Sequence, residues 1–163
     1  MTREDGVADF ADYRVRMRAG PPADVRSYYL AGLTHGVRRG GGADDAEPRR
    51  LLADAIRAHH PHTVVHDPVA AWYGADRPAM PEPARLAEFH RLTGLAASSE
   101  VCVAWLPDRD AITDSVAELQ AARCGGGTVV VITGEADDFL VRAFASVVLP
   151  DVAAFADWLP AAA

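Results

Sequence analysis

Five short runs of apolar and β-branched residues recur along the chain, and each is followed by a turn and a segment with helical spacing. The runs span Arg26–Ala31, Thr63–His66, Val101–Leu106, Thr128–Thr133 and Ser146–Leu149. Strands that alternate with helices pair in parallel, because each helix carries the chain back across the sheet. The alternation therefore predicts an α/β fold built on a doubly wound, five-stranded parallel sheet.

The helical segments between these runs support the same interpretation. They cover about 43–60, 81–97, 114–122, 137–144 and 151–159. In the second of them, Leu86, Phe89 and either Leu92 or Thr93 are expected to face the core. The expected strand order is 2-1-3-4-5, as in flavodoxin-like and Rossmann-like sheets, with the switch point between the first and third strands. The loops that follow these two strands would then flank one crevice.

The length of the chain, 163 residues, suits one domain with its own core. We expect residues 1–24 to form an N-terminal arm, with a short helix over about Val7–Met17, and residues 25–163 to form a single α/β domain. No apolar run has the length of a membrane span and no segment resembles a signal peptide. These features predict a cytoplasmic protein with no membrane partner.

Charge and composition argue against several kinds of partner and site. The net charge is -7, which argues against a nucleic-acid partner. All sixteen basic residues are arginines, so the chain has no lysine for a Schiff base or for a Walker-type phosphate site. The two cysteines, Cys102 and Cys124, are expected to be structural thiols. No cluster predicts a metal site, and no cofactor is expected.

A glycine-rich loop, Gly32–Gly42, follows the first strand and precedes a helix. This succession supplies backbone N–H groups that can surround an anion. Arg38 or Arg39 could add a bidentate contact to a phosphate or carboxylate, and Thr34 and His35 lie in the same loop. The alternative is that the loop is only a flexible connection.

The segment from Glu100 to Ala122 carries the acidic residue of greatest interest. A buried strand is followed by a polar turn and by a helix expected to begin near Asp114 or Ser115, both good N-cap residues. Glu118 would then lie about one turn inside the helix, facing the space above the end of the strand. The alternative is that Glu118 only completes a capping box with Ser115.

Two other places hold candidate residues. Trp72 and Tyr73 lie in the loop 69–80, where they are either a lid on the core or a surface on which a planar ligand stacks. Glu88 and His90 lie on the following helix, where they could approach the site or simply be solvated.

Taken in order, these motifs resemble the nucleoside 2-deoxyribosyltransferase superfamily, which includes nucleoside 5′-monophosphate N-glycosidases. The resemblance runs from about Tyr28 to Leu159. It rests on four segments, which are Tyr29–Gly32 with the glycine loop after it, Glu100–Ala104, Asp114–Ala122 and Ala71–Ala75. Their order and spacing are more specific than any one of them.

The resemblance implies chemistry at the anomeric carbon of a nucleoside or nucleotide. Glu118 would attack C1′ and form a glycosyl-enzyme, which water or a second base then resolves. The residues implied in substrate binding are Gly32, Arg38 and Ser115 at a 5′-phosphate, Trp72 and Tyr73 over the base, and Thr34, His35 and Asp114 nearby. The resemblance also implies a homodimer or a larger homo-oligomer.

The chain departs from the family pattern at three positions, and at the first of them Leu33 stands where hydrolases of monophosphates often have a small or polar residue. Leu92 stands where the family usually has a carboxylate, so Glu88 or His90 would have to take that role in catalysis. Asp114 replaces a glycine, and its negative charge would oppose a bound phosphate. Two alternatives to hydrolysis therefore remain: a deoxyribosyltransferase, or a diverged member that binds or modifies a nucleotide-like metabolite without glycosidase activity.

Overall fold

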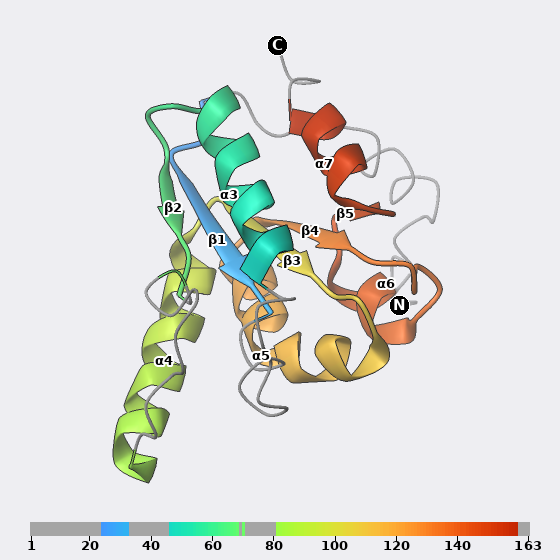
Figure 1. Cartoon of the computed structure of the whole chain (residues 1–163). Coiled ribbons are helices and arrows are strands. Elements are labelled where there is room, and N and C mark those ends of the chain that lie inside the picture. Colours follow the sequence, from blue (N-terminus) through green and yellow to red (C-terminus); the bar gives the residue numbers. More distant parts are fainter. Residues whose placement is uncertain (1–23, 33–45, 69, 71–80, 160–163) are drawn as a thin grey trace, which may run out of the picture.

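The computed structural model describes residues 24–32, 46–68, 70 and 81–159. Five parallel strands form one sheet in the order β2-β1-β3-β4-β5 (Figure 1). The strands are β1 (Ser27–Ala31), β2 (Val64–His66), β3 (Val101–Trp105), β4 (Thr128–Ile132) and β5 (Val147–Leu149). The predicted doubly wound α/β fold and its strand order are confirmed, and each strand is one residue shorter than its predicted run.

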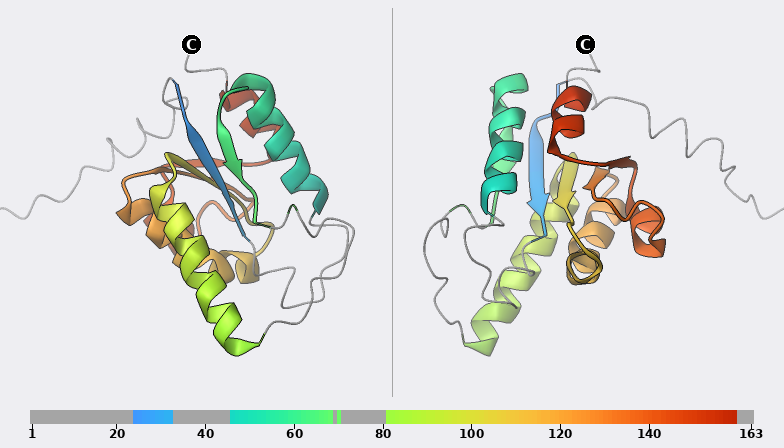
Figure 2. Two further views of the ribbon diagram at one scale, coloured as in Figure 1. Left: turned by 90° about the vertical axis from the view of Figure 1, so that its left-hand side faces the viewer. Right: turned by 45° about the vertical axis from the view of Figure 1, so that its right-hand side comes forward.

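Helices cover both faces of the sheet, as Figure 2 shows from two sides. One face is covered by α4 (Glu82–Ser98), α5 (Arg109–Cys124) and α6 (Phe139–Phe144), and the other by α3 (Ala46–His59) and α7 (Val152–Trp158). Side chains of a strand alternate between the two faces. In β1, Tyr29 therefore packs beneath α4 and α5, whereas Tyr28 and Leu30 pack beneath α3 and α7.

Helix α3 shows how sequence spacing selects the buried face. Arg49, Leu52, Ala53 and Ile56 follow the spacing i, i+3, i+4, i+7 and are all buried. Three of them are apolar and belong to the core on the face of the sheet that α3 and α7 cover. The fourth is an arginine, and its buried guanidinium needs polar partners.

Helix α5 begins earlier than the sequence predicts. Asp108 is its N-cap, and Oδ1 of Asp108 accepts a hydrogen bond of 2.9 Å from the backbone N–H of Ala111. The expected start near Asp114 or Ser115 is therefore wrong. Asp, Asn, Ser and Thr all cap helices well, and this segment offers several of them in a row, so composition alone selected the wrong one.

Helix α4 runs past the carboxyl edge of the sheet on the side of α5 (Figures 1 and 2). Its second half packs on the core through Leu92 and Ala96. Leu86 and Phe89 were expected to face the core, but they are 54% and 46% exposed. The helix is longer than the sheet it covers, so its apolar spacing continues where there is no strand beneath it.

The N-terminal arm, its expected helix at Val7–Met17, and the segments 33–45 and 71–80 lie outside the described residues. Among the helices that the structure describes, none is long and apolar enough to cross a membrane. In the same residues no three His, Cys, Asp or Glu side chains gather in a way that could hold a metal ion.

Candidate functional site

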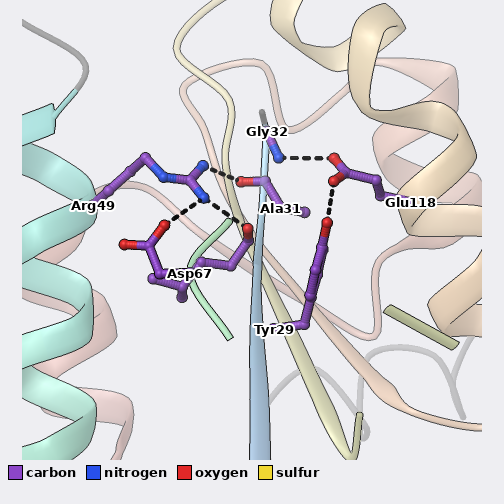
Figure 3. A network of polar contacts seen from close by, with 7 residues as sticks. Tyr29, Ala31, Gly32, Arg49, Asp67 and Glu118 are labelled. Atoms are coloured by element: carbon purple, nitrogen blue, oxygen red, sulfur yellow. Dashed lines mark hydrogen bonds and ion pairs between the residues drawn. The ribbon is translucent and has the colours of Figure 1, made fainter. Parts of the chain in front are cut away.

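Two charged side chains converge on the carboxyl end of β1 from opposite faces of the sheet (Figure 3). Glu118 comes from α5 and Arg49 from α3, and both are almost fully buried, at 6% and 5% exposure. This end of β1 lies at the switch point of the sheet, between β2 and β3. In open α/β sheets that is the place where ligands bind.

The carboxylate of Glu118 is held by two donors from β1 and the residue after it. The phenol of Tyr29 donates to Oε1, and the backbone N–H of Gly32 donates to Oε2 at 3.1 Å. Neither donor belongs to α5, and Glu118 lies well inside that helix, beyond its first two turns. The alternative that Glu118 only completes a capping box with Ser115 is therefore wrong.

Tyr29 is a neutral donor in this arrangement. Burial raises the pKa of its phenol, and the neighbouring Glu118 carboxylate raises it further. The phenol therefore keeps its proton at physiological pH and can only donate toward the carboxylate. A hydrogen bond to a charged acceptor in a buried place is among the stronger ones in proteins.

Gly32 has a backbone conformation that favours glycine. Its φ is +95°, and a Cβ atom there would lie 3.2 Å from the carbonyl oxygen of Trp105, at the end of β3. The absence of a side chain lets the chain turn away from β1 beside β3 and present its N–H to Glu118.

Arg49 holds the same strand end from the other face. Nη1 donates to the carbonyl of Ala31 at 2.7 Å, and Nη2 donates to the carbonyl of Leu30 at 2.7 Å and to Oδ1 of Asp67 at 3.2 Å. Asp67 directly follows β2, and its side chain is 4% exposed. A buried guanidinium of this kind is tolerated because it is both paired and hydrogen-bonded.

Of the substrate-binding residues predicted near Glu118, the structure describes Ser115, Asp114 and Gly32. Ser115 is buried inside α5, where its hydroxyl donates to the carbonyl of Ala111 at 2.8 Å. Asp114 lies beside it in the helix and is partly exposed. Gly32 is the one residue of the predicted glycine loop that the structure describes, and it contacts Glu118 directly. Thr34, His35, Arg38, Trp72 and Tyr73 lie outside the described residues.

Glu88 forms a bidentate ion pair with Arg91, one turn further along α4, with both N···O distances at 2.7 Å. The hydrogen bonds that Arg91 donates to Glu88, and then the charge of that carboxylate, raise the pKa of Arg91. His90 is exposed on the same helix, and its ring lies 5.7 Å from that of Phe89.

The sequence interpretation missed Tyr29, Arg49 and Asp67 as site residues. A signal existed for each of them. Tyr29 lies two residues before the end of a strand, on the side of the sheet that Glu118 approaches, and Asp67 directly follows the neighbouring strand. Arg49 is the charged member of an otherwise apolar helix face, which is typical of a cation that has a buried partner.

The two cysteines are free thiols. Cys102 is buried in β3, where burial and then the Glu118 carboxylate raise the pKa of its thiol, whereas Cys124 is exposed at the end of α5. A buried thiol held in its protonated form is a poor nucleophile. Cys102 is thus part of the packing beneath Glu118.

No protein-family model matches the chain, and no curated protein sequence matches it. The arrangement itself defines the chemistry that is available. It consists of an ionisable carboxylate with a neutral phenol and a backbone N–H as donors, backed across the strand by a buried guanidinium (Figure 3). A carboxylate is a group that can act as a nucleophile or as a general base.

Proposed function

We propose that this protein hydrolyses the N-glycosidic bond of a nucleoside or nucleoside 5′-monophosphate, with Glu118 as the nucleophile. One observation carries the proposal. The Glu118 carboxylate is oriented at the switch point of the sheet by donors from a different element, the end of β1. A glutamate whose only role was to stabilise its own helix would not need hydrogen bonds from another element.

The reaction proceeds in two balanced steps. One oxygen of Glu118 forms a bond to C1′ while the bond from C1′ to the base breaks, and the electron pair of that bond leaves with the base, which takes up a proton. Water then attacks C1′ and gives a proton to the residue that had protonated the base, while the bond from C1′ to Glu118 breaks and its electron pair returns to the carboxylate. Both steps pass through an oxocarbenium-like transition state.

Tyr29 and Gly32 fix the rotamer of the nucleophile. Each donates to one oxygen of Glu118, so the carboxylate keeps a single orientation while one lone pair of either oxygen remains for attack. Because the phenol keeps its proton, Tyr29 stabilises the carboxylate when it is regenerated in the second step.

The proton for the departing base comes from Glu88 or His90 in this proposal. Both lie on α4, a helix that extends past the carboxyl edge of the sheet beside α5 (Figure 2). Glu88 has the more sheltered position, since its side chain is 21% exposed and it shares a face of α4 with the buried Leu92. Its ion pair with Arg91 would have to open before it could carry the proton. Arg38 or another donor of the glycine loop would bind a 5′-phosphate.

The decisive experiment follows base release from a panel of nucleosides and their 5′-monophosphates. Glu118→Gln and Glu118→Ala are expected to abolish release, whereas Glu135→Gln, a change at an exposed glutamate, leaves it unchanged. A 2-deoxy-2-fluoroarabinosyl nucleoside should leave a sugar adduct on the peptide that contains Glu118. Base release that persists in Glu118→Ala would remove the proposed mechanism.

Two observations favour binding without hydrolysis as a second candidate. Both oxygens of Glu118 already accept hydrogen bonds from the protein, and Leu92 is buried where the resembled family has a carboxylate. Under this candidate, a nucleotide raises the melting temperature but no base is released. Base exchange in the presence of a second free base would instead identify a deoxyribosyltransferase.

The proposal also includes a homodimer or larger homo-oligomer in the cytoplasm. Leu86 and Phe89 support the assembly, because both expose much of their apolar surface on the projecting half of α4. The molar mass in solution, measured by light scattering, tests this part. A monomer at all concentrations used in the assay would contradict it.

A further inference from the structure

A single peptide group lies between the two buried charges of the site. The carbonyl oxygen of Ala31 accepts a hydrogen bond from Nη1 of Arg49 at 2.7 Å. The N–H of Gly32, which belongs to the same amide, donates to Oε2 of Glu118 at 3.1 Å. Figure 3 shows the cation on the oxygen side of this amide and the carboxylate on its hydrogen side.

This order of groups is the one that strengthens both hydrogen bonds. A cation at the carbonyl oxygen draws electron density through the amide and makes the N–H a better donor, and an anion at the N–H makes the oxygen a better acceptor. The effect is largest where little water is present to screen the charges. Arg49 and Glu118 are both almost fully buried, so this condition holds.

Arg49 is fixed with respect to the amide. Its Nη2 also binds the carbonyl of Leu30 and the carboxylate of Asp67, so the guanidinium is held by two acceptors from β1 and one from the residue that follows β2. Its Nε has no partner in the described part of the chain, although it is buried. The three acceptors fix the guanidinium against the end of β1, and the unsatisfied Nε is an unfavourable contribution that these contacts must offset.

We propose that Arg49 is a positioning residue for Glu118, acting across the sheet through the Ala31–Gly32 peptide group. It strengthens the Gly32 hydrogen bond that orients the carboxylate, without touching the substrate. The catalytic consequence rests on the proposed function, whereas the coupling between the two side chains can be measured in an inactive protein.

Hydrogen exchange of the Gly32 amide, followed by NMR, measures the coupling directly. Arg49→Met is expected to speed this exchange about tenfold, the factor that corresponds to weakening one charge-assisted hydrogen bond. Arg50→Met is the matched control, because it removes a positive charge from an exposed position next to Arg49 on the same helix. The amides of Val103 and Val130 in the central strands report whether the sheet as a whole has loosened.

A double-mutant cycle separates coupling from general loosening of β1. In a Glu118→Gln background the amide no longer faces an anion, so Arg49→Met should change the Gly32 exchange rate by less than threefold instead of about tenfold. Equal effects of Arg49→Met in the two backgrounds would overturn the proposal. Should Arg49→Met fail to fold, Arg49→Lys, which keeps the charge but loses the fork of donors, takes its place in the same cycle.

Activity provides the second readout. Arg49→Met should lower kcat about tenfold with little change in KM, and Arg49→Lys should recover part of the loss. An unchanged kcat in Arg49→Met, in an enzyme whose Glu118→Ala variant is inactive, would overturn the positioning role. If the unmodified protein releases no base at all, the proposed function fails, and the exchange cycle alone then decides whether Arg49 and Glu118 are coupled.

Discussion

The phenol of Tyr29 donates its hydrogen bond to Oε1 of Glu118, so the first strand and the middle of α5 meet at one buried carboxylate. The two residues are 89 positions apart in the sequence. Their contact, together with that of Gly32, gives the site its orientation. The contribution of each donor to stability and to activity can be measured separately.

Tyr29→Phe removes one donor and leaves Oε1 of Glu118 buried without it. We expect a loss of about 1–3 kcal/mol in the free energy of unfolding, the cost of leaving a buried acceptor unsatisfied. The rate of base release should fall about tenfold, since the carboxylate loses one of its two constraints. Urea unfolding and steady-state kinetics measure the two effects.

Tyr28→Phe is the matched control, one residue earlier in the same strand. The hydroxyl of Tyr28 is buried with no hydrogen-bond partner in the described structure. Its removal should therefore leave the free energy of unfolding unchanged or slightly raised, and leave activity unchanged. Equal losses for Tyr28→Phe and Tyr29→Phe would show that the contact with Glu118 contributes nothing specific.

The sheet and its order could be predicted from the sequence because each strand is a compact apolar run bounded by turns. Val101–Trp105 and Thr128–Ile132 are buried on both faces, so every position in them is apolar or small. The prediction of Glu118 as a site residue used the same logic, since the switch point of the sheet follows from strand order alone.

The partners of Glu118 could not be predicted in the same way. They depend on which face of β1 each side chain takes, and a shift of one residue in register would exchange Tyr28 for Tyr29. The start of α5 was wrong for a related reason. Several adjacent residues could cap a helix, and only the position of the preceding strand selects Asp108.

Gly32→Ala should destabilise the protein more than Gly126→Ala. Both glycines have positive φ, +95° and +82°, so each alanine variant pays a backbone strain of about 1–2 kcal/mol. A Cβ at Gly126 would meet nothing within 4 Å, whereas one at Gly32 would lie 3.2 Å from the backbone oxygen of Trp105. The difference between the free energies of unfolding of the two variants, measured in urea, gives the cost of that close contact. Equal losses in the two variants would show that the contact costs nothing.

Glu100 should make the free energy of unfolding depend on pH. It directly precedes β3, at the end of the strands opposite to Glu118. Its carboxylate accepts hydrogen bonds of 2.8 Å from the backbone N–H and from Nε of Arg26, and these contacts hold the pKa of Glu100 below its ordinary value of 4.5. Because the pKa is lower in the folded state, the stabilisation is present above pH 4.5 and is lost as the pH falls through the folded value.

Glu100→Gln tests this dependence. The variant should be less stable than the original protein at pH 7, by less than about 1 kcal/mol, because the Arg26 side chain is 87% exposed and solvent screens the pair. The gap in urea midpoint should close as the pH is lowered below 4.5. A gap that stays constant with pH would assign the difference to packing instead of charge.

Asp108→Ala should destabilise α5, because Asp108 supplies its first side-chain hydrogen bond. The carboxylate oxygen accepts from the N–H of Ala111 at 2.9 Å, and loss of such a cap costs about 1 kcal/mol. Ser115→Ala is the control, since Ser115 lies inside the helix and donates only to the carbonyl of Ala111. Alanine has the higher helix propensity, so this change should stay within about 0.5 kcal/mol of the original protein. Thermal and urea unfolding compare the two, and a larger loss for Ser115→Ala would mean that the helix starts at the later position in solution.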